Sequence, residues 1–372
     1  MTALFASLAA VLALAGQATH APDDYKRLID HYLASGAADV PSALLAWPPD
    51  PLQEAVVETI NPRKAEQKAS FYPASSRDDL VRWLEAAAMA HLEAARLAVR
   101  NERSDQAAWL LASGRTVITR LRSIVDPRRR RSLVGPALRT AEAEPAFAAR
   151  WFVAGGELLH GTPRLGAAHT HFEAAMDAYP KDARIRLGFG TVNEMEAADS
   201  VLEIVATHGP PNRTRQDAET RRRRLLREAA SAYEMTLKLN PAEVEARVRL
   251  GRTMMLQNRR REATTTLEAV RSSKPTPSLT YLACTLLALV QHQSGRAKEA
   301  ERLYLEALAA WPDGQRAAIG LSHAQWLQRQ LLTTDFLHRP PDRRPDPWAA
   351  YSLGQFTRVD TSIAELRKTI WP

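Results

Sequence analysis

Three groups of residues in this sequence are of types that could do chemistry. His169 and His171 lie two positions apart, Glu157 and His160 lie three apart, and Cys284 is the single cysteine. On an α-helix the two histidines point about 200° apart, so they cannot share a metal ion. The Glu–His pair does share a helix face, but metal sites of that type need a second pair, and the sequence has none. We therefore expect no metal, no cofactor and no disulfide within the chain.

Motifs of the common enzyme classes are absent from the sequence. It has no nucleophile elbow, zinc-protease helix, phosphate-binding loop or dinucleotide-binding glycine pattern. Cys284 falls at a position where side chains are expected to pack in the core, so we interpret it as a core residue and not as a catalytic nucleophile. These observations predict a protein that is not an enzyme.

The charge balance is basic, with 50 Lys and Arg against 42 Asp and Glu and a formal net charge of +8. Much of the excess lies in three arginine runs, Arg128–Arg131, Arg221–Arg224 and Arg259–Arg261. Such runs attract phosphates, anionic lipids or acidic peptides, or they are simply solvated helix ends. No aromatic residues are interleaved with them and no base-reading motif accompanies them, so nucleic acid is not the expected partner.

The N-terminus carries an apolar run at residues 3–15, followed by the small residues Gly16 and Ala18. This length and order are typical of a secretory signal, and the run is too short to span a bilayer. No Lys or Arg precedes it. We expect residues 1–18 to be the signal peptide of an exported, periplasmic or secreted protein whose mature chain has no transmembrane segment. If the run is instead a first hydrophobic helix, the chain is cytoplasmic.

The later part of the chain is repetitive. Pro241, Pro275 and Pro312 end helical patterns at intervals of 34 and 37 residues. Spacings in this range predict stacked helical hairpins. If Pro312 is position 32 of a 34-residue unit, Gly295 is at position 15, where a turn favours glycine, and Ala300 is at position 20, where two helices cross. Proline at position 32 ends the helix because it lacks an N–H group and clashes with the preceding turn.

Three units in phase, 149–182, 244–277 and 281–314, resemble the tetratricopeptide repeat (TPR) family. The family pattern has a bulky residue at position 4, small residues at 8, 20 and 27, an aromatic residue at 24 and proline at 32. The residues that define the repeat, including those of an interrupted unit, are Phe152, Gly156, Ala168, Phe172, Pro180, Gly190, Tyr233, Pro241, Gly251, Ala263, Pro275, Gly295, Ala300, Tyr304, Ala307 and Pro312. The resemblance implies an all-α fold, a right-handed solenoid of antiparallel helix pairs in which each unit buries its apolar face against its neighbours.

The interrupted unit spans 183–243, which is 61 residues and therefore 27 more than a standard unit. A Gly-Pro-Pro sequence blocks helix between its two helical patterns, which predicts a loop at 207–218. This insertion is either a binding element or a tolerated surface loop.

Helical patterns continue on both sides of the repeats. Residues 22–140 are interpreted as an N-terminal helical region of degenerate repeats or a cap, with a long hairpin within 78–125. Residues 315–334 are predicted to form a closing helix. Residues 338–372 are predicted to be a tail rich in proline and charge, with a short terminal helix at 360–370.

The resemblance also implies a binding surface, because in TPR proteins the first helices of successive units line the concave face. The corresponding residues here are Arg184, Thr191, Arg252, Met255, Leu289, His292, Arg316, His323 and Trp326. Family members that clamp a terminal carboxylate use Lys and Asn at such positions, and this chain has neither there. Arginines and a tryptophan suit a segment with some acidic character. The chain's own tail is the alternative occupant, since it carries Asp342, Asp346 and Trp348.

These patterns predict an exported scaffold that binds a protein or peptide through the concave face of its repeats. Two alternatives stay open. One is a helical ligand-binding or catalytic domain whose site is assembled from scattered residues, and the other is a cytosolic, arginine-rich adaptor that contacts nucleic acid.

Overall fold

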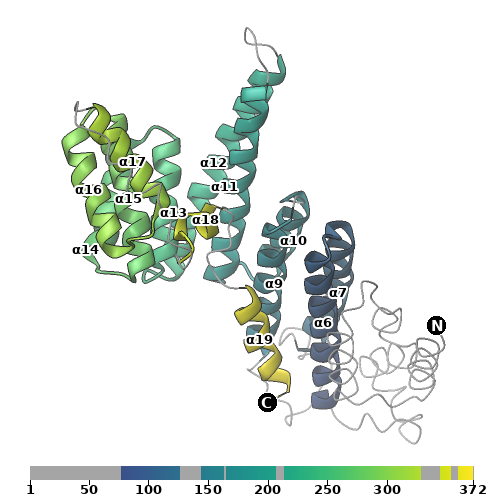
Figure 1. The fold of residues 1–372 in the computed structure, drawn as a ribbon. Helices are drawn as coiled ribbons and strands as arrows, with labels where there is room; N and C mark the ends of the chain where they lie inside the picture. Colours follow the sequence, from purple (N-terminus) through teal and green to yellow (C-terminus); the bar gives the residue numbers. More distant parts are fainter. Residues whose placement is uncertain are drawn as a thin grey trace, which may run out of the picture. The chain divides into compact units, whose positions relative to one another are not determined.

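A computed structural model describes residues 77–125, 144–162, 165–206, 213–327, 344–352 and 359–371. All regular structure in these ranges is α-helix, and neighbouring helices along the chain pack as pairs (Figure 1). The predicted all-α, helical-repeat fold is confirmed. The predicted signal peptide lies outside the described residues, as do parts of the N-terminal region.

The chain divides into two compact units. The first unit comprises the chain up to His171 together with the C-terminal segment from Arg358. The second unit runs from Phe172 to Thr357. The division falls within α10 (Leu165–Ala178), which therefore contributes residues to both.

In the first unit, α6 (Arg77–Arg100) and α7 (Ser104–Val125) form a long hairpin, and α9 (Glu144–His160) packs against both. Trp151 of α9 is fully buried, and its indole N–H donates a hydrogen bond of 2.7 Å to a backbone carbonyl of α6. Gly114 of α7 lies beside it, where an added Cβ would be 2.5 Å from the indole ring. The close approach of these helices thus depends on glycine at that position.

The C-terminal helix of the chain, α19 (Val359–Ile370), also belongs to the first unit and packs against α6 and α9 (Figure 1). Ile363 and Leu366 are buried on its inner face, one helical turn apart. Asp360 in its first turn accepts hydrogen bonds of 3.2 Å from two arginines of α6. A carboxylate at this end of a helix also interacts favourably with the helix dipole.

The second unit contains the repeats that the sequence predicts. After the end of α10, its described helices are α11 (Ala183–Ala206), α12 (Arg213–Leu239), α13 (Val244–Leu256), α14 (Arg260–Ser272), α15 (Pro277–Gln293), α16 (Ala297–Ala310), α17 (Gln315–Leu327) and α18 (Pro347–Ser352). From α11 to α17, every helix contacts the next one along the chain. The first helices of successive pairs also contact one another, α11 with α13, α13 with α15, and α15 with α17. They therefore form one continuous layer of the array.

The side chain at position 24 is wedged between its own hairpin and the next. An added Cβ on Gly190 would lie 2.6 Å from the ring of Tyr233 in the same hairpin. An added Cβ on Gly320 of α17 would lie 2.3 Å from the ring of Tyr304 in the preceding hairpin. The first contact recurs between Gly251 and Leu267, and the second between Gly188 and Phe172. The repeat in the sequence thus corresponds to a repeat of contacts.

The turn at position 15 also recurs. Gly295 has a φ of +74°, and Asn258, at position 15 of the preceding unit, has a φ of 63°. Glycine adopts this left-handed conformation without strain, and asparagine tolerates it better than most residues.

The predicted loop at 207–218 is wrong over its second half, because residues 213–218 form the first turns of α12. Helix-breaking residues end at Pro211, and those that follow include good helix formers. Arg215 pairs with Glu219 one turn later, at 3.2 Å, which supports the helix from its start. Residues 207–212 lie outside the described part.

Three other boundaries differ from the predicted ones. Residues 278–280, which separate two predicted units, lie in α15, because Pro277 occupies a first-turn position where its missing N–H costs nothing. Helix α9 begins at Glu144, five residues before residue 149, where the first predicted unit starts. Trp348 belongs to a part of the tail where no helix is predicted, but it lies in α18, which Asp346 caps by accepting a hydrogen bond of 2.8 Å from the Trp348 N–H. Helix α17 is described as far as Leu327.

Candidate binding site

A cluster of buried charges lies among α11, α12 and α13 of the second unit. Glu194 is 1% exposed and accepts hydrogen bonds from the Tyr233 hydroxyl at 2.7 Å and from Arg249 at 3.1 Å. Its other carboxylate oxygen accepts a hydrogen bond from Arg252. Arg249 is also 1% exposed and donates to Glu245 at 2.7 Å. Two carboxylates thus face two guanidinium groups, and this balance offsets part of the cost of burying the charges.

The pairings maintain the charge state of each group. Burial would raise the pKa of Glu194, but Arg252 and Arg249 hold that pKa below its usual value. Burial would lower the pKa of Arg249, but Glu245, Tyr233 and Glu194 keep it well above its usual value. Burial and the charge of Glu194 raise the pKa of Tyr233, so its hydroxyl remains a donor.

The tail segment 344–352 covers this cluster. Tyr351 is fully buried, and the Arg249 guanidinium lies 4.4 Å from the centroid of its ring. Arg249 also donates a hydrogen bond of 3.3 Å to the Tyr351 carbonyl. Trp348 contacts two arginines, with its ring centroid 5.9 Å from the guanidinium of Arg252 and 5.3 Å from that of Arg316. These distances fall in the range of cation–π interactions.

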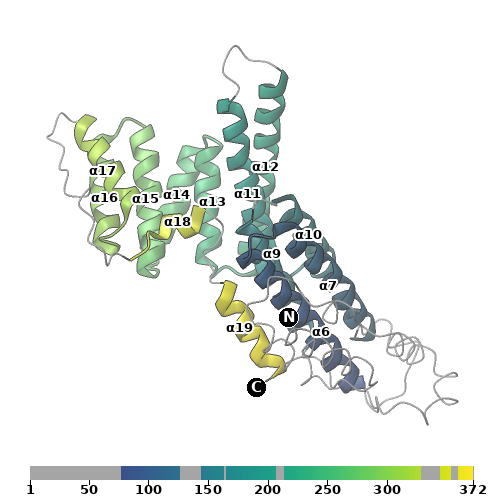
Figure 2. The same ribbon diagram turned by 45° about the vertical axis from the view of Figure 1, so that its right-hand side comes forward.

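Asp346 fixes the start of the covering segment. One of its carboxylate oxygens accepts hydrogen bonds from the Tyr281 hydroxyl at 3.2 Å and from the backbone N–H of Arg316 at 3.0 Å. We refer to Arg249, Arg252, Tyr281 and Arg316 as the α18 seat. Helix α18 therefore lies across the layer of first helices, next to α13 and α15 (Figure 2). This is the alternative occupant that the sequence suggests for the concave face.

The predicted binding residues are brought together only in part. Arg252 and Arg316 meet at Trp348 in the seat. His292 of α15 and His323 of α17 stack on each other, with ring centroids 4.7 Å apart and Nε2 and Nδ1 2.9 Å apart. Burial and the neighbouring His323 lower the pKa of His292. The stacking shows that side chains of successive first helices face the same side of the array.

The other predicted binding residues do not contact the tail in the interactions observed. Met255 is buried and Leu289 is half-buried in the core. Thr191 is buried, and its hydroxyl donates to a carbonyl of its own helix. Arg184 is exposed beside Asp182. The side chain of Trp326 lies outside the described residues.

Sequence reasoning missed the centre of the cluster. Glu194 occupies position 12 of the interrupted unit, which Met255 and Trp326 occupy in theirs, so the rule that indicates those two residues also indicates Glu194. Arg249 occupies position 6, and Tyr351 lies in the tail, where the repeat pattern gives no signal.

Across the described residues, no three His, Cys, Asp or Glu side chains are grouped closely enough to bind a metal ion. None of the described helices has the length and apolar character of a membrane span. Cys284 is buried, and burial together with the charge of Glu306 raises the pKa of its thiol to about 12, so the thiol is protonated.

No family model matches the chain, and no curated protein sequence does. Solved structures match it in part. TTC0263, a thermophilic TPR protein in Thermus thermophilus, is 16% identical over 64% of this chain and 99% of its own, with a TM-score of 0.39. MamA is 14% identical over 55% of this chain and 90% of its own, with a TM-score of 0.32. The TPR-like fold of this chain is supported by its own recurring contacts at positions 8 and 24 and by the recurring positive φ at position 15.

Proposed function

We propose that this chain is an exported, non-catalytic scaffold that binds a segment of a protein partner at the α18 seat. The observation that supports the proposal is the occupant that the seat already holds. A short peptide segment, 344–352, lies there through side-chain and backbone contacts of the kind that a separate peptide would make. The seat residues come from α13, α15 and α17, which belong to the layer predicted to bind.

The occupant defines the chemistry of the partner segment. Its pattern is a carboxylate at Asp346, an indole two residues later at Trp348, and a phenol three residues further on at Tyr351. The carboxylate accepts two hydrogen bonds, and each ring lies against guanidinium groups. Tryptophan and tyrosine in such contacts commonly supply most of the energy of an interface. The partner is therefore a protein that presents an acidic residue followed by aromatic residues on a short helical turn.

A partner must compete with the tail. Because the tail belongs to the same chain, its effective concentration at the seat is on the order of millimolar. The unmodified protein should therefore bind a free copy of the segment weakly, and a variant with a loosened tail should bind it more tightly.

The test is a titration of a labelled synthetic peptide of residues 344–352, followed by fluorescence anisotropy. The Trp348→Ala protein should bind this peptide at least about tenfold more tightly than the unmodified protein, since its own tail loses the contacts with Arg252 and Arg316. Adding Arg316→Glu to that variant should weaken binding again. The matched control protein is Trp109→Ala, which removes an exposed tryptophan of α7 in the first unit.

The control peptide carries alanine at both aromatic positions. Equal affinity of the two peptides for the Trp348→Ala protein contradicts the proposed chemistry. Equal affinity of the Trp348→Ala and unmodified proteins for the native peptide contradicts competition by the tail.

Export rests on the apolar run at residues 3–15. N-terminal sequencing of the protein isolated from its own host should find a mature chain that begins near Thr19. A chain that retains Met1 in the cytosolic fraction would contradict export and leave the binding proposal intact.

A further inference from the structure

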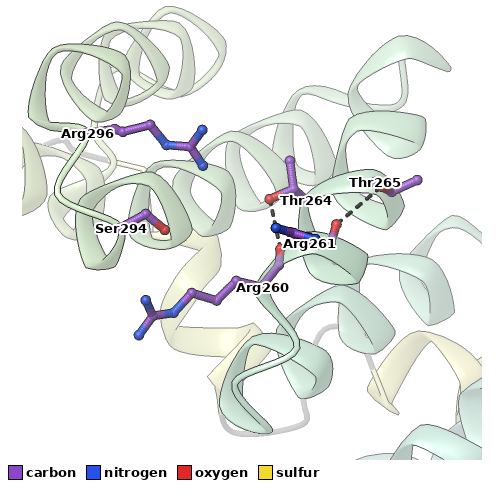
Figure 3. A pocket seen from close by; sticks show the side chains of 6 residues that line it. All are labelled: Arg260, Arg261, Thr264, Thr265, Ser294 and Arg296. Carbon is purple, nitrogen blue, oxygen red and sulfur yellow. Dashed lines mark hydrogen bonds between the residues drawn. The ribbon is translucent and has the colours of Figure 1, made fainter.

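A second surface of the same unit carries an arginine-lined pocket. Its lining residues are Arg260, Arg261, Thr264, Thr265, Ser294 and Arg296, and its volume is ≈ 460 Å³. Arg260 and Arg261 come from the first turn of α14, and Ser294 and Arg296 from the turn between α15 and α16 (Figure 3). The pocket thus lies between two successive hairpins, along the edge of the array that is formed by the turn within each hairpin.

Three guanidinium groups lie around this pocket, and no carboxylate lines it. Arg261 and Arg296 form no ion pair with any described carboxylate, and Arg260 donates only to the backbone carbonyl of Gln293, at 3.2 Å. The pKa of the nearby Glu299 is lowered chiefly by the hydrogen bond that it accepts from Arg302. The charge of Arg296 lowers this pKa to a smaller extent.

Three other surface arginines of these hairpins are paired with carboxylates. Arg259 bonds Glu262, Arg271 bonds Glu268, and Arg302 bonds Glu299, each at less than 3 Å. The neighbouring arginines are neutralised by carboxylates, whereas the three pocket arginines are not. Positive charge is therefore concentrated at the pocket.

The hydroxyl groups of the pocket are already used as donors. Thr264 donates to the carbonyl of Arg260 at 2.9 Å, and Thr265 donates to that of Arg261 at 3.2 Å, as the dashed lines in Figure 3 show. The guanidinium groups are thus the donors that remain for a ligand. Planar guanidinium groups match the oxygens of carboxylates and phosphates.

We propose that this pocket binds a phosphate monoester. A carboxylate would neutralise one of the three charges, whereas a phosphate monoester carries close to two negative charges and offers three acceptor oxygens, one for each arginine. The pocket has the size of small-molecule sites, about 300–1,000 Å³, so a phosphate group leaves room for the organic group that carries it. The site shares no residue with the α18 seat, so either proposal can fail without the other.

The test uses a neutral-ended peptide with one phosphoserine as the probe, titrated by calorimetry at low ionic strength. The Arg261→Gln/Arg296→Gln variant should bind it about tenfold more weakly than the unmodified protein. The matched control is Arg223→Gln/Arg227→Gln, which removes the same charge from exposed positions on α12. The folding of both variants is checked by circular dichroism, and Arg261→Lys/Arg296→Lys, which keeps the charge, should bind with intermediate affinity.

The ionisation of the probe separates a phosphate site from general attraction of anions. The second pKa of phosphoserine is about 6, so affinity should rise between about pH 5 and 7, whereas a peptide with aspartate should show no such rise. Inorganic phosphate should bind more weakly than the peptide, because it leaves the rest of the pocket unfilled.

Three results would overturn the proposal. One is equal loss of binding in the control variant, which would show that net charge alone attracts the probe. Another is unchanged binding in both glutamine variants. The third is equal affinity for inorganic phosphate and the peptide, which would exclude a site shaped for a monoester.

Discussion

Replacing Glu194 by Gln tests whether the buried charges hold the second unit together. Glutamine keeps the shape of the side chain and an acceptor oxygen for Tyr233, but it removes the negative charge that faces Arg249 and Arg252. In the variant, Arg249 keeps its bond to Glu245, whereas Arg252 loses the carboxylate with which it pairs. One positive charge is therefore left unbalanced in a site that water barely reaches.

The magnitude follows from the exposure of the two arginines. Removing one partner from a buried ion pair costs about 3–5 kcal/mol. Arg252 is 16% exposed, so water screens part of the unbalanced charge, and we expect a cost of about 3 kcal/mol. The matched control is Glu299→Gln, where the bond to Arg302 is 2.6 Å long but the side chains are 43% and 52% exposed. A surface pair of this kind should contribute less than about 1 kcal/mol.

Urea unfolding followed by far-UV circular dichroism measures both free energies. A lower midpoint with an unchanged m-value reports a change in stability. The double variant Glu194→Gln/Arg252→Gln restores the charge balance, so its free energy of unfolding should exceed that of Glu194→Gln alone. The reasoning is refuted if Glu194→Gln and Glu299→Gln cost the same.

Three further predictions concern the repeats and the first unit. Ala300 is fully buried on α16, so Ala300→Trp should lower thermal stability by an overpacking cost of about 1–3 kcal/mol, and unchanged melting contradicts the assigned phase. Gly295 has a φ of +74°, so Gly295→Val should destabilise the fold, whereas Asn258→Gly at the equivalent turn should not; urea unfolding of both variants compares them. Burial, together with the charge of Arg115, lowers the pKa of His171 to about 3. Because the unfolded pKa is about 6.5, this histidine's contribution is complete above that pH and about 2 kcal/mol is lost by pH 5. In His171→Gln, the difference in free energy of unfolding between pH 8 and pH 5 should shrink by about that amount, and an unchanged difference contradicts the assignment.

The repeats could be predicted from the sequence because each of their signals is local. A proline that ends a helix, a residue with positive φ at a turn, and a small residue at a crossing act within a few positions of themselves. Their recurrence at a fixed period then implies the packing of neighbours, and the contacts of Tyr233 and Tyr304 follow from it. The boundaries were less predictable, since α12 and α15 begin within residues that the repeat period assigns to connecting segments.

The seat could be predicted only in part, because its contacts join distant segments. The periodic rule indicates Arg252 and Arg316, and it also applies to Glu194, which the prediction left out. Arg249 contacts Glu194 across 55 positions of the chain and Tyr351 across 102. No pattern within one repeat contains that information. Arginine side chains are also rarely buried, so sequence reasoning would place Arg249 on the exposed surface.

The buried charges also determine which segments the seat can accept. Arg249 donates to the backbone carbonyl of Tyr351, and any peptide that follows the same path can supply that carbonyl. The ring that covers the guanidinium is different, because only an aromatic side chain provides it. A segment without that ring leaves Arg249 open to water on one side and forgoes about 0.5–2 kcal/mol of cation–π energy for each missing ring. Discrimination among partners should therefore depend on the two aromatic positions more than on hydrogen bonding, which is why the control peptide replaces both rings and keeps the backbone and the carboxylate.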